Sequence, residues 1–198
     1  MVSLVGSRDA TDATIIQQSL RNSELFAVLY DRYATQLYHY AYRRVGPEAA
    51  EDVVADTFLV AFQRRGRYDL ERPDALPWLF GIVSKEISRR RRSEQARYRA
   101  MARAFADPSV DVLAERVTAQ VTAEALRGQL ASALAALSTG DRDALLLVAW
   151  GGLTYDEVAL ALRIPVGTVR SRLNRARRKT REALGGTDPT FETEHWDE

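Results

Sequence analysis

The chain has 198 residues, 46% of them hydrophobic, with 28 basic residues, 27 acidic residues and no cysteine. This length allows one large or two small domains with sizeable cores, and the missing cysteine excludes disulfides and cysteine-ligated zinc. A formal net charge of +1 favours no class of partner. No apolar run is long enough to cross a bilayer, and the start of the chain lacks the pattern of a signal peptide. We therefore expect a cytoplasmic protein without membrane insertion.

Apolar residues recur at helical spacing along nearly the whole chain, and the alternation typical of strands is absent, so we expect an all-α fold. After a polar N-terminal arm (residues 1–22), the pattern predicts helices over about 26–45 and 48–64 and a long third helix over 75–104. Further helices are expected over 123–137 and 141–150, followed by a helix-turn-helix over 153–184. These helices form two small domains, 23–105 and 123–186, joined by a flexible linker over 106–122 and followed by an acidic tail over 187–198.

The helix that begins near residue 48 has two unlike sides. Ala50, Val53, Val54, Thr57 and Ala61 share one side, which suits a core. The other side carries carboxylates and a leucine, which are the residue types of a protein-docking surface. Its members are Glu48, Asp52, Ala55, Asp56, Leu59 and Gln63. From the residues alone, a solvated acidic face is the competing interpretation.

Aromatic and basic residues follow one another over positions 68–92. A flipped base needs an apolar or stacking pocket, and a separated DNA strand needs cations. Tyr68, Trp78 and the run Arg89–Arg92 supply these residue types. Core packing is the alternative role for Trp78 and Phe80.

The segment 153–184 predicts a helix-turn-helix. Thr154 and Glu157 form a capping box for its first helix, and Pro165 ends that helix where a second can begin. In the second helix, Val166, Val169, Leu173, Ala176 and Leu184 share one apolar stripe.

The opposite side of this second helix is basic and hydroxylic, and no acidic residue occurs from Arg163 to Arg181. One packed face and one positive face suit a helix that enters a DNA major groove. The predicted DNA-binding residues are Thr168, Arg170, Ser171, Arg172, Arg175, Arg178 and Lys179. A solvated basic face, or one that meets RNA or a membrane surface, is the alternative.

Two ordered matches resemble one known family. Residues 153–184, with Ile164-Pro165-Val166-Gly167-Thr168-Val169-Arg170-Ser171-Arg172-Leu173, resemble region 4 of the extracytoplasmic-function (ECF, group 4) sigma factors of bacterial RNA polymerase. Residues 50–59 and 75–92 resemble region 2 of the same family. The resemblance implies that the second domain reads the −35 promoter element, while the first domain docks on core RNA polymerase and melts the −10 element.

By this resemblance, residues of the helix near position 48 contact core polymerase: Glu48, Asp52, Asp56, Thr57, Phe58 and Leu59. The residues assigned to the −10 element are Tyr68, Trp78, Lys85, Arg89, Arg90, Arg91 and Arg92. Core polymerase and promoter DNA are the implied partners, and an anti-sigma factor is a candidate further partner.

Two residues depart from the family pattern. Arg163 stands where glycine is common, at a turn that would favour a left-handed residue. Lys85 stands where asparagine is common, which bears on the preferred −10 sequence.

The sequence offers few candidate catalytic residues. Its only histidines are His39 and His195, and no glycine-rich phosphate loop or metal-ligand spacing occurs. We therefore expect no enzyme, no cofactor, no metal and no small-molecule substrate. The alternative function is a stand-alone helix-turn-helix transcriptional regulator, which would need neither the acidic helix nor the segment 78–92.

Overall fold

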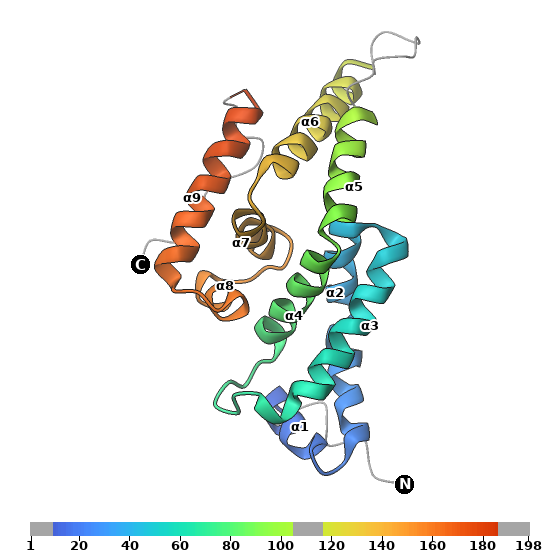
Figure 1. Ribbon diagram of the computed structural model, residues 1–198, viewed down its shortest axis with the longest axis vertical. Coiled ribbons are helices and arrows are strands. Elements are labelled where there is room, and N and C mark those ends of the chain that lie inside the picture. Colours follow the sequence, from blue (N-terminus) through green and yellow to red (C-terminus); the bar gives the residue numbers. More distant parts are fainter. Residues whose placement is uncertain (1–9, 105–116, 186–198) are drawn as a thin grey trace.

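The computed structural model describes residues 10–104 and 117–185, and every regular element within these ranges is a helix (Figure 1). This confirms the expected all-α class. The N-terminal half (residues 10–104) contains five α-helices: α1 (Asp12–Ser19), α2 (Ala27–Val45), α3 (Pro47–Arg64), α4 (Leu76–Arg89) and α5 (Arg91–Ala104). The C-terminal half (residues 117–185) contains α6 (Val117–Ala136), α7 (Thr139–Ala149), α8 (Tyr155–Leu162) and α9 (Val166–Ala183).

Helices α2, α3 and α4 enclose the core of the N-terminal half. The apolar side predicted for α3 is the buried one, since Ala50, Val53, Val54 and Ala61 are all at most 5% exposed. Gly46 separates α2 from α3 with φ at +91°, a conformation that glycine adopts without a steric penalty. Pro47 then begins α3, where its missing N–H costs no helical hydrogen bond.

The polar N-terminal arm contains one helix, α1, which buries Ile15 and Ile16. One expectation about the N-terminal half was wrong. The long third helix is interrupted at Arg90, so α4 and α5 are separate helices. No proline or glycine causes this break. The amide of Arg90 bonds to Ile87 instead, and its guanidinium lies 3.0 Å from the carboxylate of Asp56 in α3.

The helix-turn-helix forms as predicted. Thr154 and Glu157 make both bonds of the capping box at the start of α8. Arg163 ends α8 in the left-handed conformation, with φ 54° and ψ 50°. The turn therefore keeps the left-handed conformation that favours glycine. In this conformation the side chain of Arg163 causes steric strain.

The two halves pack against each other. Helix α5 runs beside α6, and α4 lies against α8 (Figure 1). At the α4–α8 contact, a Cβ placed on Gly81 would lie 2.4 Å from the carbonyl oxygen of Ala161, so the two backbones approach closely. We call this packing the closed arrangement. Helix α6 begins at Val117, inside the stretch expected to be linker, while residues 105–116 lie outside the described residues.

Charged residues also join the halves in the closed arrangement. Arg44 of α2 is fully buried and contacts Glu94 of α5 and Asp143 of α7, at 2.6 and 2.7 Å. Arg142 of α7 is equally buried, with its nearest carboxylate oxygen, that of Glu94, at 3.9 Å. A charge removed from water is costly unless it is paired, so the buried contact between Arg44 and Asp143 couples the two halves.

Candidate nucleic-acid and partner surfaces

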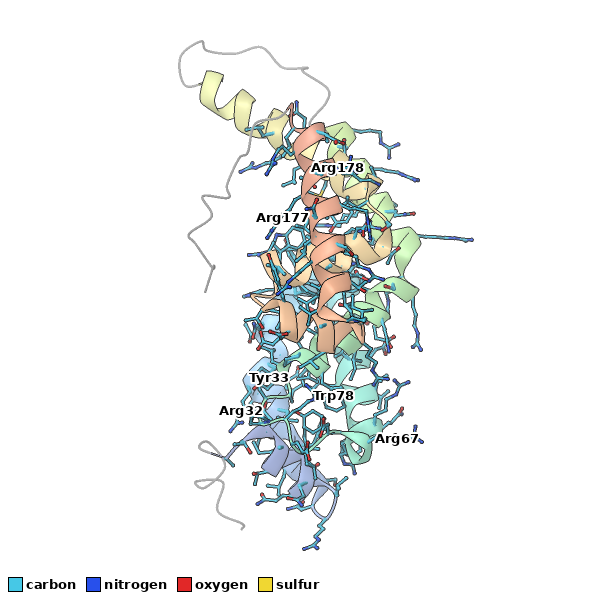
Figure 2. The ribbon with its side chains drawn as sticks, turned by 90° about the vertical axis from the view of Figure 1, so that its left-hand side faces the viewer. Arg32, Tyr33, Arg67, Trp78, Arg177 and Arg178 are labelled. Atoms are coloured by element: carbon cyan, nitrogen blue, oxygen red, sulfur yellow. The ribbon has the colours of Figure 1, made fainter. Side chains whose placement is uncertain are left out.

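Helix α9 presents a basic face to solvent. Val169, Leu173 and Ala176 are buried against the rest of the C-terminal half, which turns the opposite side outward. Figure 2 shows Arg177 and Arg178 towards the C-terminal end of α9. Five of the seven predicted DNA-binding residues of this helix are exposed, and Thr168 and Arg172 are half-buried. The exposed five are Arg170, Ser171, Arg175, Arg178 and Lys179.

Two arginines of α9 contact the start of α7. The guanidinium of Arg172 lies over Gly140, and Nη2 of Arg175 donates to Oδ1 of Asp141 across 2.9 Å. Burial would raise the pKa of Asp141, but the hydrogen bonds from Arg175 and Ser138 outweigh it and hold that pKa below its usual value. Arg175 is therefore partly committed within the protein, which leaves it less free for DNA than the sequence suggests.

Two of the residues predicted to meet the −10 element, Tyr68 and Trp78, lie at the α3–α4 loop (residues 68–75). Tyr68 and Trp78 stack with their ring centroids 5.0 Å apart. Tyr68 is buried and its hydroxyl lies 2.9 Å from the carbonyl oxygens of Arg72 and Asp74. Trp78 is only partly buried, whereas Phe80 is a core residue. The core alternative is thus confirmed for Phe80, while Trp78 packs against the core and keeps part of its side chain at the surface.

The predicted cations of α4 and α5 follow one another away from this loop. Lys85 is exposed, and partial burial together with Arg163, Arg64 and Arg89 lowers its pKa. Arg89 is 69% exposed and contacts the buried carboxylate of Glu86. Arg90 is half-buried beside Asp56, and Arg92 is exposed. The side chain of Arg91 lies outside the described residues.

A groove of about 790 Å³ separates the α3–α4 loop from the helix-turn-helix. Its walls include Arg67, Tyr68 and Trp78 on one side and Arg163 and Pro165 on the other. Figure 2 shows Arg67 and Trp78 beyond the N-terminal end of α9. The turn between α8 and α9 therefore lies across this groove from the α3–α4 loop in the closed arrangement.

The predicted docking face of α3 divides into exposed and buried residues. Glu48, Asp52 and Leu59 are exposed, with Leu59 55% accessible despite its apolar side chain. Thr57 and Phe58 need correction, because they lie in the core rather than on this face. The hydroxyl of Thr57 donates to the carbonyl of Val53, and Phe58 packs on Tyr30 with ring centroids 4.9 Å apart.

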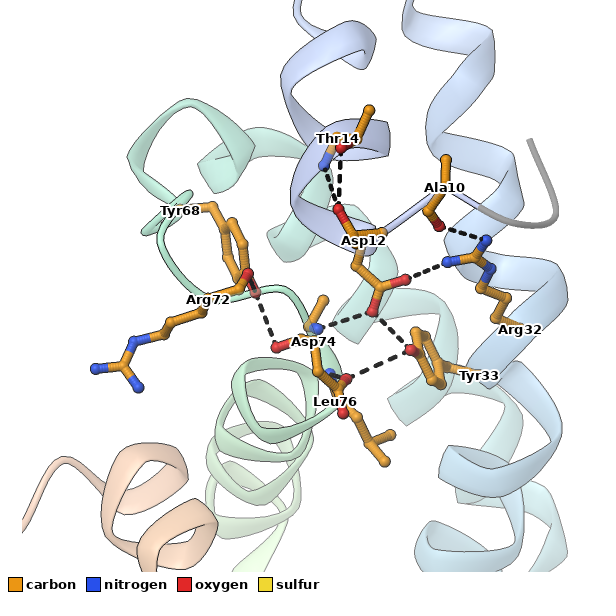
Figure 3. Close-up of polar contacts among 11 residues, drawn as sticks. Ala10, Asp12, Thr14, Arg32, Tyr33, Tyr68, Arg72, Asp74 and Leu76 are labelled. Atoms are coloured by element: carbon orange, nitrogen blue, oxygen red, sulfur yellow. Dashed lines mark hydrogen bonds and ion pairs between the residues drawn. The ribbon is translucent and has the colours of Figure 1, made fainter. Parts of the chain in front are cut away.

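Sequence reasoning missed two sets of polar residues. The first is Asp12, whose carboxylate contacts α2 and the α3–α4 loop (Figure 3). The second is the buried set of Arg44, Glu94, Arg142 and Asp143. The only local signal for Asp12 was its position after Thr11, which caps α1. No local signal marks the second set, because its partners are far apart in the chain.

Within the described residues, no group of three or more histidine, cysteine, aspartate or glutamate side chains is placed to hold a metal ion. No helix in the same ranges combines the length and apolarity needed to cross a membrane.

Comparison with known proteins agrees with this layout. Residues 29–97 match the family described as Sigma-70 region 2, and residues 127–180 match Sigma-70, region 4. The order of these two regions, on an all-helical fold whose helix-turn-helix exposes a basic face, defines the class as a sigma factor.

Proteins with similar sequences place the chain in one subclass of sigma factors. The ECF RNA polymerase sigma factor SigK of Mycolicibacterium vanbaalenii is 30% identical over 175 residues, covering 88% of this chain and 89% of the relative. SigK of Mycobacterium ulcerans is 27% identical over 180 residues, covering 90% of this chain and 96% of the relative. The chain belongs to the ECF family of RNA polymerase sigma factors. Core RNA polymerase and promoter DNA are its partners, and the stand-alone regulator is not favoured because region 2 is present.

Two solved structures share the fold. CnrH in complex with the cytosolic domain of CnrY matches with a TM-score of 0.60 and 26% identity, covering 89% of this chain and 99% of CnrH. The sigma factor RpoE of Bartonella quintana, in complex with the anti-sigma factor NepR, matches with a TM-score of 0.50 and 24% identity, covering 86% and 99%. The second likeness concerns the fold alone.

Proposed function

We propose that α9 reads the −35 element in the major groove, while the α3–α4 loop and the cations of α4 and α5 receive the melted −10 element. The exposed basic face of α9, opposite a fully apolar packed face, supports this assignment most strongly. Thr168, Ser171 and Arg172 are assigned to base edges, and Arg178 and Lys179 to phosphates. Arg175 is also assigned to a base edge, which it contacts when DNA displaces its guanidinium from Asp141.

Substitutions in α9 test the −35 assignment in transcription with core polymerase on a promoter library. Arg172→Ala is expected to cost about 1–3 kcal/mol at preferred sites and to relax preference at one position. Lys179→Ala should weaken all sequences alike and reduce the salt dependence. A uniform loss in both variants would contradict the division into base and phosphate contacts.

We also propose that Asp52 and Leu59, exposed on α3, contact core polymerase. Surface changes away from caps and cores alter stability by about 0.5 kcal/mol or less, whereas interface anchors can contribute about 2 kcal/mol or more to binding. Asp52→Arg combined with Leu59→Ala should therefore preserve the melting temperature and remove association with core enzyme. Asp56 is left unchanged because it also pairs with Arg90.

Matched variants on the same helix separate docking from folding. Val54→Asp, on the buried side, should unfold the N-terminal half. Glu51→Arg changes the same charge as Asp52→Arg at another exposed position of α3 and should have the smaller effect on docking. If Asp52→Arg with Leu59→Ala still assembled and initiated normally, this face of α3 would not be the docking surface.

The closed arrangement adds a requirement to this function. Because α4 packs on α8 and α5 on α6, the closed arrangement fixes the distance between the −10 and −35 surfaces. We propose that the halves part when the protein joins core polymerase in the cytoplasm, and that an anti-sigma factor, where one exists, would act on this equilibrium.

A further inference from the structure

Asp12 connects the start of α1 to the end of the α3–α4 loop. Its side chain is only 3% exposed, and Oδ2 accepts a hydrogen bond of 2.8 Å from the amide of Ala75. The amide of Asp12 donates in turn to the carbonyl of Pro73 at 3.0 Å. Asp12 therefore holds two positions of the loop that are about sixty residues away in the chain. Figure 3 shows the bond from its carboxylate to the loop.

Helix α2 fixes Asp12 from the other side. Arg32 donates to Oδ1 at 2.5 Å, and the hydroxyl of Tyr33 donates to Oδ2 at 2.6 Å. Burial and the bond to Asp12 raise the pKa of Tyr33, so its hydroxyl keeps the proton that it donates. Because α2 is a long helix of the core, these bonds fix the position of the loop relative to the rest of the N-terminal half.

The loop itself is closed by its own residues. The hydroxyl of Tyr68 bonds within the loop, as described above, and Oδ1 of Asp74 accepts from the amide of Leu76 at 2.7 Å. The side chains of residues 69–72 are exposed. The loop is thus held at both ends and presents its middle to solvent next to Trp78.

We propose that Asp12 is a positioning residue for recognition of the −10 element. It holds the α3–α4 loop in the conformation that receives a base of the separated strand, and it does not contact DNA itself. A binding site selects between similar ligands only when its contacting groups are fixed by a supporting set of bonds. This inference rests on the proposed role of the loop and Trp78.

The test uses holoenzyme assembled from the full chain and core polymerase. The probe is a pool of non-template single strands, randomised across the −10 element, and the readout is the enrichment ratio between preferred and disfavoured bases. Asp12→Ala should reduce this ratio at least about tenfold, the loss that corresponds to one hydrogen bond to a charged group. Affinity for core enzyme and preference at the −35 element should not change.

Three variants make the result specific. Asp12→Asn keeps an oxygen acceptor for Ala75 and should recover much of the selectivity. Tyr33→Phe removes one anchor of Asp12, conserves the ring and should show a smaller loss in the same direction. Thr11→Ala removes the cap of α1, in which the Thr11 hydroxyl accepts from the amide of Thr14. It leaves the carboxylate of Asp12 in place, so it should keep full selectivity.

The outcomes are distinguishable. If Thr11→Ala lost as much selectivity as Asp12→Ala, Asp12 would act only by stabilising α1, and the inference would be overturned. If Trp78→Ala lost selectivity while Asp12→Ala and Tyr33→Phe kept it, the loop would read the −10 element without help from Asp12. If Trp78→Ala also kept selectivity, the proposed function of the loop would fail, and the inference with it.

Discussion

Arg44 of α2 donates to Asp143 of α7 across 2.7 Å, and this bond links the half of the chain that matches region 2 to the half that matches region 4. Arg44 also bonds to Glu94 and to the hydroxyl of Tyr40. Each of these groups is buried, so loss of any one leaves the others without full compensation.

Replacing Asp143 should therefore open the closed arrangement. Removing one partner of a buried ion pair typically costs about 3–5 kcal/mol because the remaining charge stays buried. Asp143→Ala should lower the transfer efficiency between fluorophores on cysteines placed at Glu51 and Asn174, two exposed sites in a chain without natural cysteine.

The matched control for Asp143→Ala is Glu182→Ala. It removes an ion pair with Arg178 in which both side chains are about 60% exposed, and such pairs contribute about 0–1 kcal/mol. In Glu182→Ala, the transfer efficiency between the two fluorophores should equal that of the parent protein. Equal efficiency in Asp143→Ala as well would show that the buried charges do not hold the halves together.

Gly81→Ala should separate the halves by a different route. The added methyl would lie 2.4 Å from the backbone oxygen of Ala161, which no side-chain rotation can relieve. We expect the same drop in transfer efficiency as for Asp143→Ala, with the helix content of both halves preserved. Gly167→Ala, where a Cβ would meet nothing within 4 Å, should leave the efficiency unchanged.

Arg163→Gly should raise the stability of the helix-turn-helix. A non-glycine residue in the left-handed region costs about 1–2 kcal/mol, and part of this gain is offset by the greater freedom of glycine in the unfolded chain. Arg163→Ala keeps the Cβ and so keeps the strain. In thermal unfolding, Arg163→Gly should melt above Arg163→Ala, and the reverse order would contradict the strain at this turn.

Asp141 should make stability depend on pH in the acid range. Its pKa is lower in the folded protein than its ordinary value of 3.8, because the bonds from Arg175 and Ser138 outweigh burial. The carboxylate therefore stabilises the fold above the unfolded pKa, and this contribution is lost as the pH falls through the folded pKa.

Urea unfolding between pH 7 and pH 3 measures this contribution. Asp141→Asn should be less stable than the parent protein at pH 7, and the difference should shrink as the pH falls. Asp31→Asn removes an exposed carboxylate from α2 and should show no comparable change. A difference independent of pH would mean that Asp141→Asn destabilises the fold through packing rather than through lost charge.

The sequence predicted those features that depend on neighbouring residues, such as the buried side of a helix and its first residue. The spacing of Val169, Leu173 and Ala176 indicated the buried side of α9, and Thr154 with Glu157 indicated the start of α8. The helical wheel of α3 placed Thr57 on the buried side, and resemblance alone placed it in the docking site. The structure agrees with the wheel, since Thr57 is fully buried.

Contacts between distant residues were beyond reach of the sequence. Helix α1 is short and polar, and Asp12 finds its partners in α2 and at Ala75. In the sequence, Arg44 resembles an ordinary surface residue at the end of a helix. It is buried because α5 and α7 pack against it. The same applies to Gly81, whose importance depends on how closely α8 approaches.

The buried guanidinium of Arg142 gives the closed arrangement a dependence on temperature. None of its three nitrogens has a hydrogen bond within the described ranges, so parting of the halves returns a poorly compensated ion to water. Hydration of ions becomes less favourable on heating, and the attraction between apolar surfaces weakens on cooling. Both effects favour the closed arrangement at higher temperature. Cold should loosen the contact between the halves, and warmth should tighten it until the helices themselves begin to melt.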